Sequence, residues 1–239
     1  MNLSDLRIAD PDVEHVADER DILDELLPLS GARVLELGCG KAEKTRLVAQ
    51  KAQSVLALEV DEIQLAQNRG SEHPANIRFE HGGAENIPAA DSSFDIVLMF
   101  KSLHHVPVDL MHDALSEIHR VLKTGGFAYI SEPVYAGDFN EILRLFHDEK
   151  RVRESAYAAV TQAVSMNRLT LVTQRFFLQP MHFDDFRQFE EKVLMATHTD
   201  HKLSPALHDE VRLKFNKHMS PTGATFQMPI RVDLLSKSS

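Results

Sequence analysis

A glycine turn between an apolar run and a polar segment is the feature that most constrains this chain. The apolar run covers residues 34–37, the turn contains Gly38 and Gly40, and the polar segment over 43–52 has the composition of a helix. A strand, a glycine turn and a helix N-terminus together direct backbone N–H groups outward beside the positive end of a helix dipole. The stretch therefore predicts a binding site for a ligand that carries a carboxylate or a phosphate.

Two common nucleotide sites share this outline, and Glu43 argues against both. A phosphate-binding P-loop needs its second glycine where Glu43 stands, and a carboxylate there would repel phosphates. The dinucleotide fingerprint needs a glycine at the same position, three residues after Gly40. What remains is an acid two residues before the first glycine, Glu36, which suits a ligand with a positive charge as well as a carboxylate.

The segment over residues 36–42 resembles motif I of the class I S-adenosylmethionine-dependent methyltransferases, of the ubiquinone-methyltransferase-like (methyltransferase type 11) group, whose pattern is E/D-x-G-x-G-x-G. Residues 31–135 carry the resemblance well, and the rest of the chain carries it only loosely. The resemblance implies S-adenosyl-L-methionine as the cofactor and Glu36 as a neighbour of its ammonium group. Ala42 departs from the pattern, because it stands where the family usually has a third glycine.

The same resemblance names the residues expected along the cofactor. The turn would approach its methionyl part, and Lys41 would bring a cation toward its carboxylate. Residues 54–59 predict a second buried strand, and Glu59 at its end is the candidate for two hydrogen bonds to ribose hydroxyls, with Asp61 as the weaker one. The alternative is an acid that merely caps the next helix, which suits Asp61 better. The expected cofactor contacts are Glu36, Gly38, Cys39, Gly40, Lys41, Glu59, Val60, Ala84, Glu85 and Lys101.

Residues 81–88 are similar to the family's G-D-A-E-x-L-P segment, in which the acid holds the adenine amino group and the next backbone N–H contacts the ring. Gly83 stands at the acidic position, so the backbone contact at Ala84 is expected to persist and the side-chain contact is not. The loss of one hydrogen bond costs about 1 kcal/mol. Glu85 or Asn86 is the candidate to replace it.

A second specific match follows the predicted central strand over residues 94–100. Leu103, His104 and His105 match the family's L-H-H, at the carboxyl end of a strand, where open α/β sheets bind their ligands. His104 is the catalytic candidate, as a base or a hydrogen-bonding group, and the alternative is that both imidazoles only hold the loop. We expect no metal site, because adjacent side chains diverge and no suitably spaced carboxylate accompanies them. Glu132 is expected at the same edge as His104.

The pattern of elements predicts an α/β fold in a single domain over 1–239. We expect a Rossmann-like doubly wound sheet of about seven strands, mostly parallel with an antiparallel last strand, and helices on both faces. Residues 31–135 form the cofactor-binding core in this prediction, and a leading helix over 11–28 precedes it. Helices over 138–168 suggest a substrate lid inserted at 136–170.

The charge and hydropathy of the chain limit the classes of partner that we expect for it. The chain has a net charge of -10, and Cys39 is its only cysteine, so no internal disulfide can form. Residues 1–135 carry 12 basic and 23 acidic side chains, so this part of the chain lacks the excess of basic residues that is typical of nucleic-acid binding. The chain has no apolar run near eighteen residues and no targeting leader in the first ten, which predicts a cytoplasmic protein without a membrane partner.

The resemblance implies an enzyme that transfers a methyl group from S-adenosyl-L-methionine, and the acidic first half of the chain favours a small-molecule acceptor. Two alternatives stay open. In the first alternative, the enzyme methylates a tRNA or a protein. In the second, the chain is a non-catalytic cofactor-binding or regulatory protein with the same fold.

Overall fold

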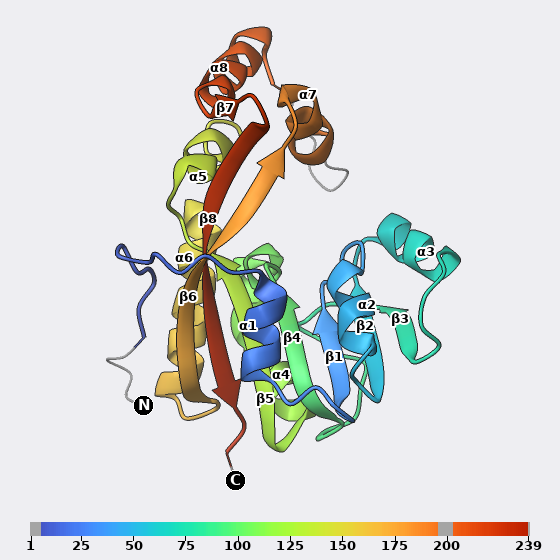
Figure 1. The fold of residues 1–239 in the computed structure, drawn as a ribbon. Coiled ribbons are helices and arrows are strands. Elements are labelled where there is room, and N and C mark those ends of the chain that lie inside the picture. Colours follow the sequence, from blue (N-terminus) through green and yellow to red (C-terminus); the bar gives the residue numbers. More distant parts are fainter. Residues whose placement is uncertain (1–5, 196–202, 239) are drawn as a thin grey trace.

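The computed structural model describes residues 6–195 and 203–238, and it shows the doubly wound sheet predicted from the sequence (Figure 1). The first five residues, part of the stretch expected to lack a leader, lie outside this description. The strand order is β3-β2-β1-β4-β5-β8-β6, with β7 paired to β8. Neighbours from β3 to β5 pair in parallel, whereas β8 runs antiparallel to both β5 and β6, as predicted for the last strand. The strands are β1 (Arg33–Leu37), β2 (Ser54–Glu59), β3 (Ile77–His81), β4 (Phe94–Phe100), β5 (Leu122–Pro133), β6 (Thr170–Phe183), β7 (Met219–Ser220) and β8 (Gly223–Ser236).

Helices cover both faces of the sheet, and the central strands are apolar on both sides for that reason. Along β4, Ile96 and Leu98 pack on one face, and Val97 and Met99 on the other, as the two-residue period of a strand requires. The helical segments are α1 (Glu19–Leu26), α2 (Glu43–Ala49), α3 (Glu62–Gly70), η2 (Leu103–His105), η3 (Val108–Leu110), α4 (Met111–Val121), α5 (Asp138–Leu143), α6 (Lys150–Ser165), α7 (Phe186–Phe189), the π-helical η4 (Glu190–Leu194) and α8 (Pro205–Asn216).

The first helix is shorter than predicted. The expectation of a helix over 11–28 was wrong at its start, because Asp18 caps α1 by accepting a hydrogen bond from the backbone N–H of Arg20. Val16, assigned to the helix from its spacing, instead forms an isolated bridge with Leu178. The buried face of α1 carries Ile22 and Leu23, which pack in the same core as β1.

β6 and β8 extend beyond the sheet and carry a second packed unit, which we call the lobe: α5, α7, η4, α8, β7 and the distal parts of β6 and β8 (Figure 1). Its interior is rich in phenylalanine. The buried members are Phe139, Ile142, Phe183, Phe189, Val211, Phe215, Ala224 and Phe226.

The lid predicted over 136–170 is divided between these two parts. α5 belongs to the lobe, whereas α6 packs against α4 on the sheet, and its Ala156, Ala159 and Val160 lie in the main core. The lobe instead draws α7 and α8 from the later sequence. Whether it acts as a lid stays a prediction.

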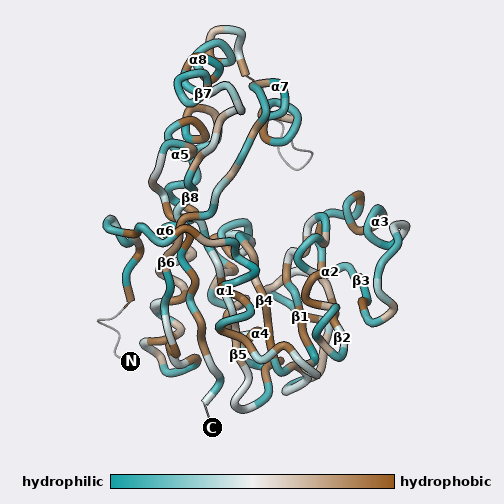
Figure 2. The backbone as a smooth tube through the Cα atoms, in the orientation of Figure 1, coloured by the Kyte–Doolittle hydropathy of each residue, from teal (hydrophilic) through white to brown (hydrophobic). Residues whose placement is uncertain are grey.

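Hydropathy follows this arrangement. Figure 2 shows the hydrophobic stretches along the central strands and hydrophilic stretches toward the margin formed by α3 and β3. None of the helices in the described part of the chain has the length and apolar character needed to cross a membrane.

Candidate active site

The glycine loop joins β1 to α2 through three residues in the left-handed backbone region. The φ angles are 72° at Gly38, 50° at Gly40 and 58° at Ala42. A Cβ atom at Gly38 would lie 2.8 Å from the Cβ of Ser102, so only glycine permits this close approach of the segment that follows β4. A Cβ at Gly40 would meet no described heavy atom within 4 Å. The loop is therefore packed at Gly38 and open at Gly40, where a ligand can approach the backbone.

Glu59 holds the loop from the end of β2. One carboxylate oxygen accepts the backbone N–H of Gly40 at 2.7 Å, and the other accepts those of Val60 and Asp61 at 2.9 and 3.0 Å. The sequence argument preferred Glu59 over Asp61 for the ribose, with Asp61 better suited to helix capping. The capping role is confirmed, since Asp61 accepts hydrogen bonds from the N–H groups of Ile63 and Gln64 at the start of α3.

Asn68 is a loop contact that the sequence argument missed. It is buried on α3, and its side-chain amide donates to the carbonyl of Gly40 at 2.7 Å and lies 3.7 Å from the sulfur of Cys39. Burial raises the pKa of the Cys39 thiol, so this cysteine is a packing residue, as expected. The sequence gave no signal for Asn68, because its role depends on how α3 lies against the loop.

Three carboxylates gather around this loop: Glu36, Glu59 and Glu19 of α1. Glu36 is 2% exposed, and burial raises its pKa to about 7, with Glu19 and Glu59 acting in the same direction and Lys44 against it. Glu19 is fully buried and forms ion pairs with Lys101 at 2.8 Å and with Lys44 at 3.7 Å. The site therefore holds both charge signs, and the sequence argument had identified only Glu36, Glu59 and Lys101.

Two of these carboxylates have an oxygen without a partner. Oε2 of Glu36 and Oε1 of Glu19 are buried, and neither has a hydrogen-bond partner of good geometry among the residues that the structure describes, although the Thr45 hydroxyl is close enough to act on Glu36. A buried acceptor of this kind is costly unless a ligand or water satisfies it. These oxygens indicate that the site is built to receive a donor.

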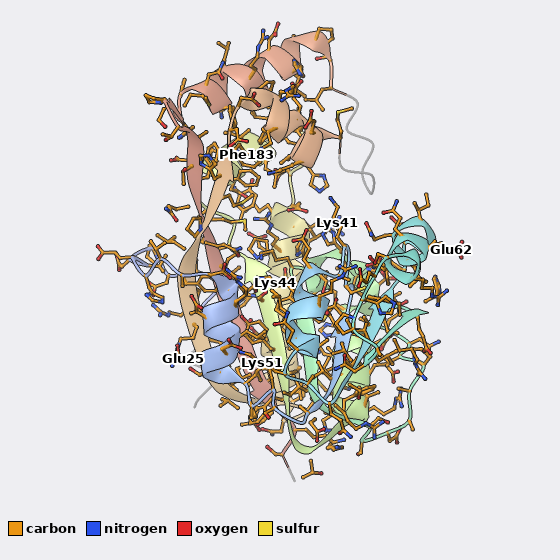
Figure 3. The ribbon with its side chains drawn as sticks, turned by 45° about the vertical axis from the view of Figure 1, so that its right-hand side comes forward. Glu25, Lys41, Lys44, Lys51, Glu62 and Phe183 are labelled. Carbon is orange, nitrogen blue, oxygen red and sulfur yellow. The ribbon has the colours of Figure 1, made fainter. Side chains whose placement is uncertain are left out.

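Lys41 and Lys44 lie at different depths. Lys44 is partly buried between α2 and α1, whereas Lys41 is exposed at the end of the loop. Figure 3 shows Lys41 at the edge of the sheet that faces the lobe containing Phe183, while Lys51 and Glu25 lie toward the opposite end. Both lysines are candidates to bind a ligand carboxylate. Lys41 lies at the exposed end of the loop, and Lys44 is the more buried of the two.

The segment after β3 places Glu85 next to Gly83, where the family's acid is missing. A Cβ atom at Gly83 would lie 2.3 and 2.4 Å from the two carboxylate oxygens of Glu85. The Glu85 carboxylate thus fills the space where a side chain at position 83 would begin. Ala84 is buried, and Val60 is 60% exposed at the neighbouring strand end.

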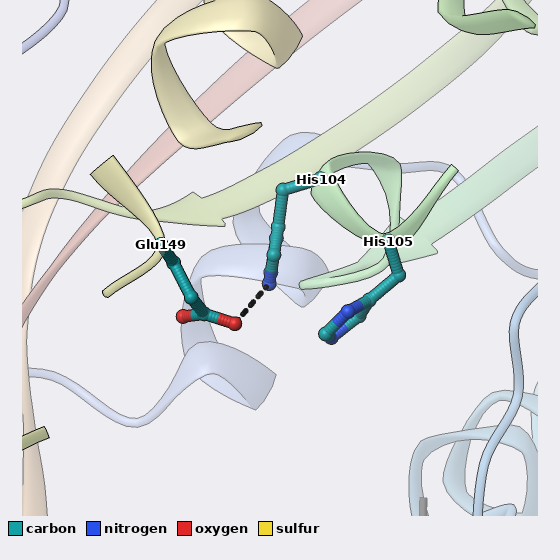
Figure 4. A group of neighbouring side chains, drawn as sticks. All are labelled: His104, His105 and Glu149. Atoms are coloured by element: carbon teal, nitrogen blue, oxygen red, sulfur yellow. Dashed lines mark ion pairs between the residues drawn. The ribbon is translucent and has the colours of Figure 1, made fainter. Parts of the chain in front are cut away.

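His104 lies in a buried network at the carboxyl end of β4. Its Nδ1 donates to Glu132 at 2.5 Å, and the other oxygen of Glu132 accepts the backbone N–H of Leu103 at 2.9 Å. Its Nε2 points to Glu149, 3.6 Å away (Figure 4). Burial alone would lower the pKa of His104, but the two carboxylates raise it to about 9. An imidazole with this pKa is protonated at neutral pH, which favours the hydrogen-bonding role over the base.

The argument against a carboxylate–histidine cluster was wrong. The rings of His104 and His105 do not diverge, since their centroids are 4.1 Å apart, and Glu149 joins them (Figure 4). Spacing could not reveal Glu149, because it precedes α6 and reaches the pair only when α6 packs on the sheet. Glu132 lies beside His104, as predicted.

Fold and site together define a doubly wound α/β protein that binds a ligand of mixed charge at the carboxyl ends of its parallel strands. Residues 34–126 match the family described as Methyltransferase domain. The chain is 30% identical over 179 residues to 27-O-demethylrifamycin SV methyltransferase of Amycolatopsis mediterranei, covering 71% of this chain and 62% of that protein. It is 32% identical over 117 residues to demethylmenaquinone methyltransferase of Staphylococcus haemolyticus, covering 47% and 48%. The chain thus spans less than two thirds of either relative.

A solved structure shows the same fold. The YcgJ protein of Bacillus subtilis superposes with a TM-score of 0.60 at 18% identity, covering 92% of this chain and 97% of that one. The chain is similar to the class I S-adenosylmethionine-dependent methyltransferases, of the methyltransferase type 11 group, as its motifs predicted. Its cofactor is S-adenosyl-L-methionine.

The residues present fit this cofactor. S-adenosyl-L-methionine carries a sulfonium, an ammonium and a carboxylate, and the glycine loop is surrounded by carboxylates and lysines. The partnerless oxygens of Glu36 and Glu19 suit an ammonium donor, and the open backbone at Gly40 leaves room for the methionyl chain. The individual contacts of the ten predicted residues stay predictions.

Proposed function

We propose that this protein transfers a methyl group from S-adenosyl-L-methionine to a small-molecule acceptor. The observation that carries the proposal is the set of buried carboxylates beside the glycine loop, one of them paired with Lys44 and Lys101, because such a site offers partners for both charge signs of the cofactor. When bound, the cofactor supplies a sulfonium methyl group, which the acceptor's nucleophilic atom takes as the carbon–sulfur bond breaks and the sulfur leaves neutral.

The protein's task in such a displacement is positioning and exclusion of water. Glu59 fixes the loop through Gly40, and its carboxylate keeps acceptor capacity for ribose hydroxyls. Glu36 and Glu19 hold the ammonium end, and Glu85 takes the adenine amino group in place of an acid at position 83. His104, protonated and held between Glu132 and Glu149, fixes its loop at the acceptor side of the site.

Three observations support a small acceptor. The two relatives above are named for a rifamycin and a menaquinone precursor. The acidic surface of residues 1–135 repels nucleic acid. The lobe, with its phenylalanine interior, stands over the edge of the sheet that holds the glycine loop, where an acceptor must enter (Figures 1 and 3).

Calorimetry and labelled methyl transfer test the proposal. The purified protein is titrated with S-adenosyl-L-methionine. The protein and methyl-labelled cofactor are then incubated with a low-molecular-weight extract that has been treated with nuclease and protease. We expect binding in the micromolar range and label in an organic-soluble product. Label that enters only untreated RNA or protein would overturn the small acceptor. Absence of binding at high micromolar cofactor would overturn methyl transfer and favour the non-catalytic alternative.

A further inference from the structure

We propose that His104, His105 and Glu149 form a binding site for a zinc-type divalent cation, a property beyond the proposed methyl transfer. One ligand atom from each of these residues lies within 4.8 Å of the others (Figure 4). The donor set of two imidazoles and one carboxylate is one that zinc binds in proteins. Magnesium and calcium prefer oxygen ligands, so this set discriminates against them.

The orientation of His104 is that of a metal ligand with a supporting carboxylate. A metal-binding histidine usually donates its second ring N–H to a carboxylate, which fixes the ring and directs the other nitrogen to the metal. Glu132 provides this contact to Nδ1 at 2.5 Å and is itself held by the N–H of Leu103. The Nε2 atom is thereby directed to the Glu149 carboxylate, and a bound metal ion would displace the proton that this nitrogen carries in the metal-free protein.

Glu149 is held in the matching orientation from its other side. Arg153 binds its Oε2 atom at 2.5 Å, which leaves Oε1 for the imidazoles. The Oε1 atom lies 3.6 Å from Nε2 of His104 and 3.0 Å from Nε2 of His147, so an additional imidazole is within reach of the same oxygen. The side chains of His104 and Glu149 are 3% and 10% exposed, whereas His105 is exposed, so two of the ligands are shielded and the site opens to solvent at the third.

The distances need only a small adjustment. Tetrahedral zinc with bonds of about 2.0–2.1 Å separates its ligand atoms by roughly 3.3 Å. The 3.6 Å between His104 and Glu149 is close to that value, and the ligand atoms of all three residues lie within 4.8 Å of one another. Three protein ligands leave one position open, as in catalytic zinc sites.

Metal titration of the whole protein tests the inference. The protein is stripped with a chelator and then titrated at pH 8 with zinc by calorimetry and with cobalt by its visible absorption. We expect one equivalent of each to bind at micromolar concentration, a cobalt spectrum of low coordination number, and no heat from magnesium. Failure of zinc and cobalt to bind at high micromolar concentration would overturn the site.

Variants locate the binding. His105→Ala alters an exposed ligand, so the fold should persist, and we expect zinc affinity to fall by at least about tenfold. Glu132→Gln, a positioning change, should weaken zinc by about 10–100-fold while one equivalent still binds. The matched control is His208→Ala, which removes another histidine–carboxylate pair, His208 with Glu190 at 2.6 Å, and should leave zinc binding unchanged. Unchanged affinity in His105→Ala, or an equal loss in the control, would contradict the assignment. Calorimetry of His105→Ala with S-adenosyl-L-methionine shows whether cofactor binding is lost together with zinc binding. It therefore separates failure of the zinc site from failure of the proposed function.

Discussion

At the scale of single residues, Gly83 and Glu85 lie where we propose that one residue takes over the role of another. The family's adenine acid is absent at position 83, and the Glu85 carboxylate occupies the space in front of it. The φ angle of Gly83 lies outside the left-handed region, so a side chain is compatible with its backbone once that space is free. The two positions can therefore exchange roles.

This exchange predicts a rescue. Glu85→Ala should weaken S-adenosyl-L-methionine binding by about fivefold, the equivalent of one hydrogen bond of about 1 kcal/mol. Adding Gly83→Asp to that variant should restore most of the affinity, whereas Gly83→Asp alone should not improve it, because its side chain would collide with Glu85. Calorimetry on the four proteins checks the cycle. Equal affinity of Glu85→Ala and the unmodified protein would exclude a role for Glu85 at the adenine.

Glu36 predicts a pH-dependent stability. Its pKa is raised from 4.5 to about 7 by burial, so the native state binds this proton more tightly than the unfolded state. Its contribution to stability is then full below pH 4.5 and is lost as the pH rises through 7. The free energy of unfolding of Glu36→Gln, relative to that of the unmodified protein, should rise by on the order of 3 kcal/mol from pH 5 to pH 8. Urea unfolding at both pH values measures the difference, and a gap that does not change with pH would refute the buried titration.

At the scale of elements, the glycine loop combines a structural position with a binding position. Gly38 is pressed against Ser102, whose hydroxyl donates to the carbonyl of Leu37, so a side chain here disturbs the contact between β1 and β4. Gly40 has open space in front of it. The two glycines should therefore respond differently to the same substitution.

We predict that Gly38→Ala lowers both stability and cofactor affinity, whereas Gly40→Ala acts mainly on affinity. Both carry the cost of a left-handed backbone, about 1 kcal/mol, and the contact with Ser102 adds to it only at Gly38. Thermal unfolding and cofactor calorimetry on the pair separate the effects. If Gly40→Ala bound the cofactor normally, the open side of the loop would not be the cofactor's path.

At the scale of the whole molecule, the lobe has a hydrophobic core of its own. Its phenylalanines pack on one another, with Phe215 fully buried against Phe183, Phe186, Phe189 and Phe226, and they form a cluster separate from those on the two faces of the sheet. β6 and β8 are the strands shared by the two parts.

The division predicts a local effect of a core mutation. Phe215→Ala should destabilise the lobe by about 3–5 kcal/mol, the usual cost of removing a buried phenylalanine. Hydrogen exchange should speed up over α8 and the distal parts of β6 and β8, while β1, β2 and β4 stay protected and cofactor affinity is unchanged. Loss of protection throughout the sheet would show that the two cores unfold as one.

The sequence by itself determined the local features of this protein. The strand, glycine turn and helix over 33–49, the acid at the end of β2, the cap at Asp61 and the parallel core lie within short stretches, where hydrophobic period and backbone geometry act directly on neighbouring residues. The resemblance of these stretches to the family's motifs then indicated the cofactor. The start of α1 was misplaced, because spacing alone did not weigh the cap at Asp18.

Only the tertiary structure decided which distant side chains meet. Glu19 reaches Lys101 because α1 packs on the sheet, Asn68 reaches the glycine loop because α3 does, and Glu149 reaches His104 because α6 covers the opposite face. These contacts depend on how amphipathic helices bury their apolar sides, which sets the direction of the polar side chains at their ends. Local periodicity identifies a helix, but the partners of its charged residues are chosen by packing across the whole fold.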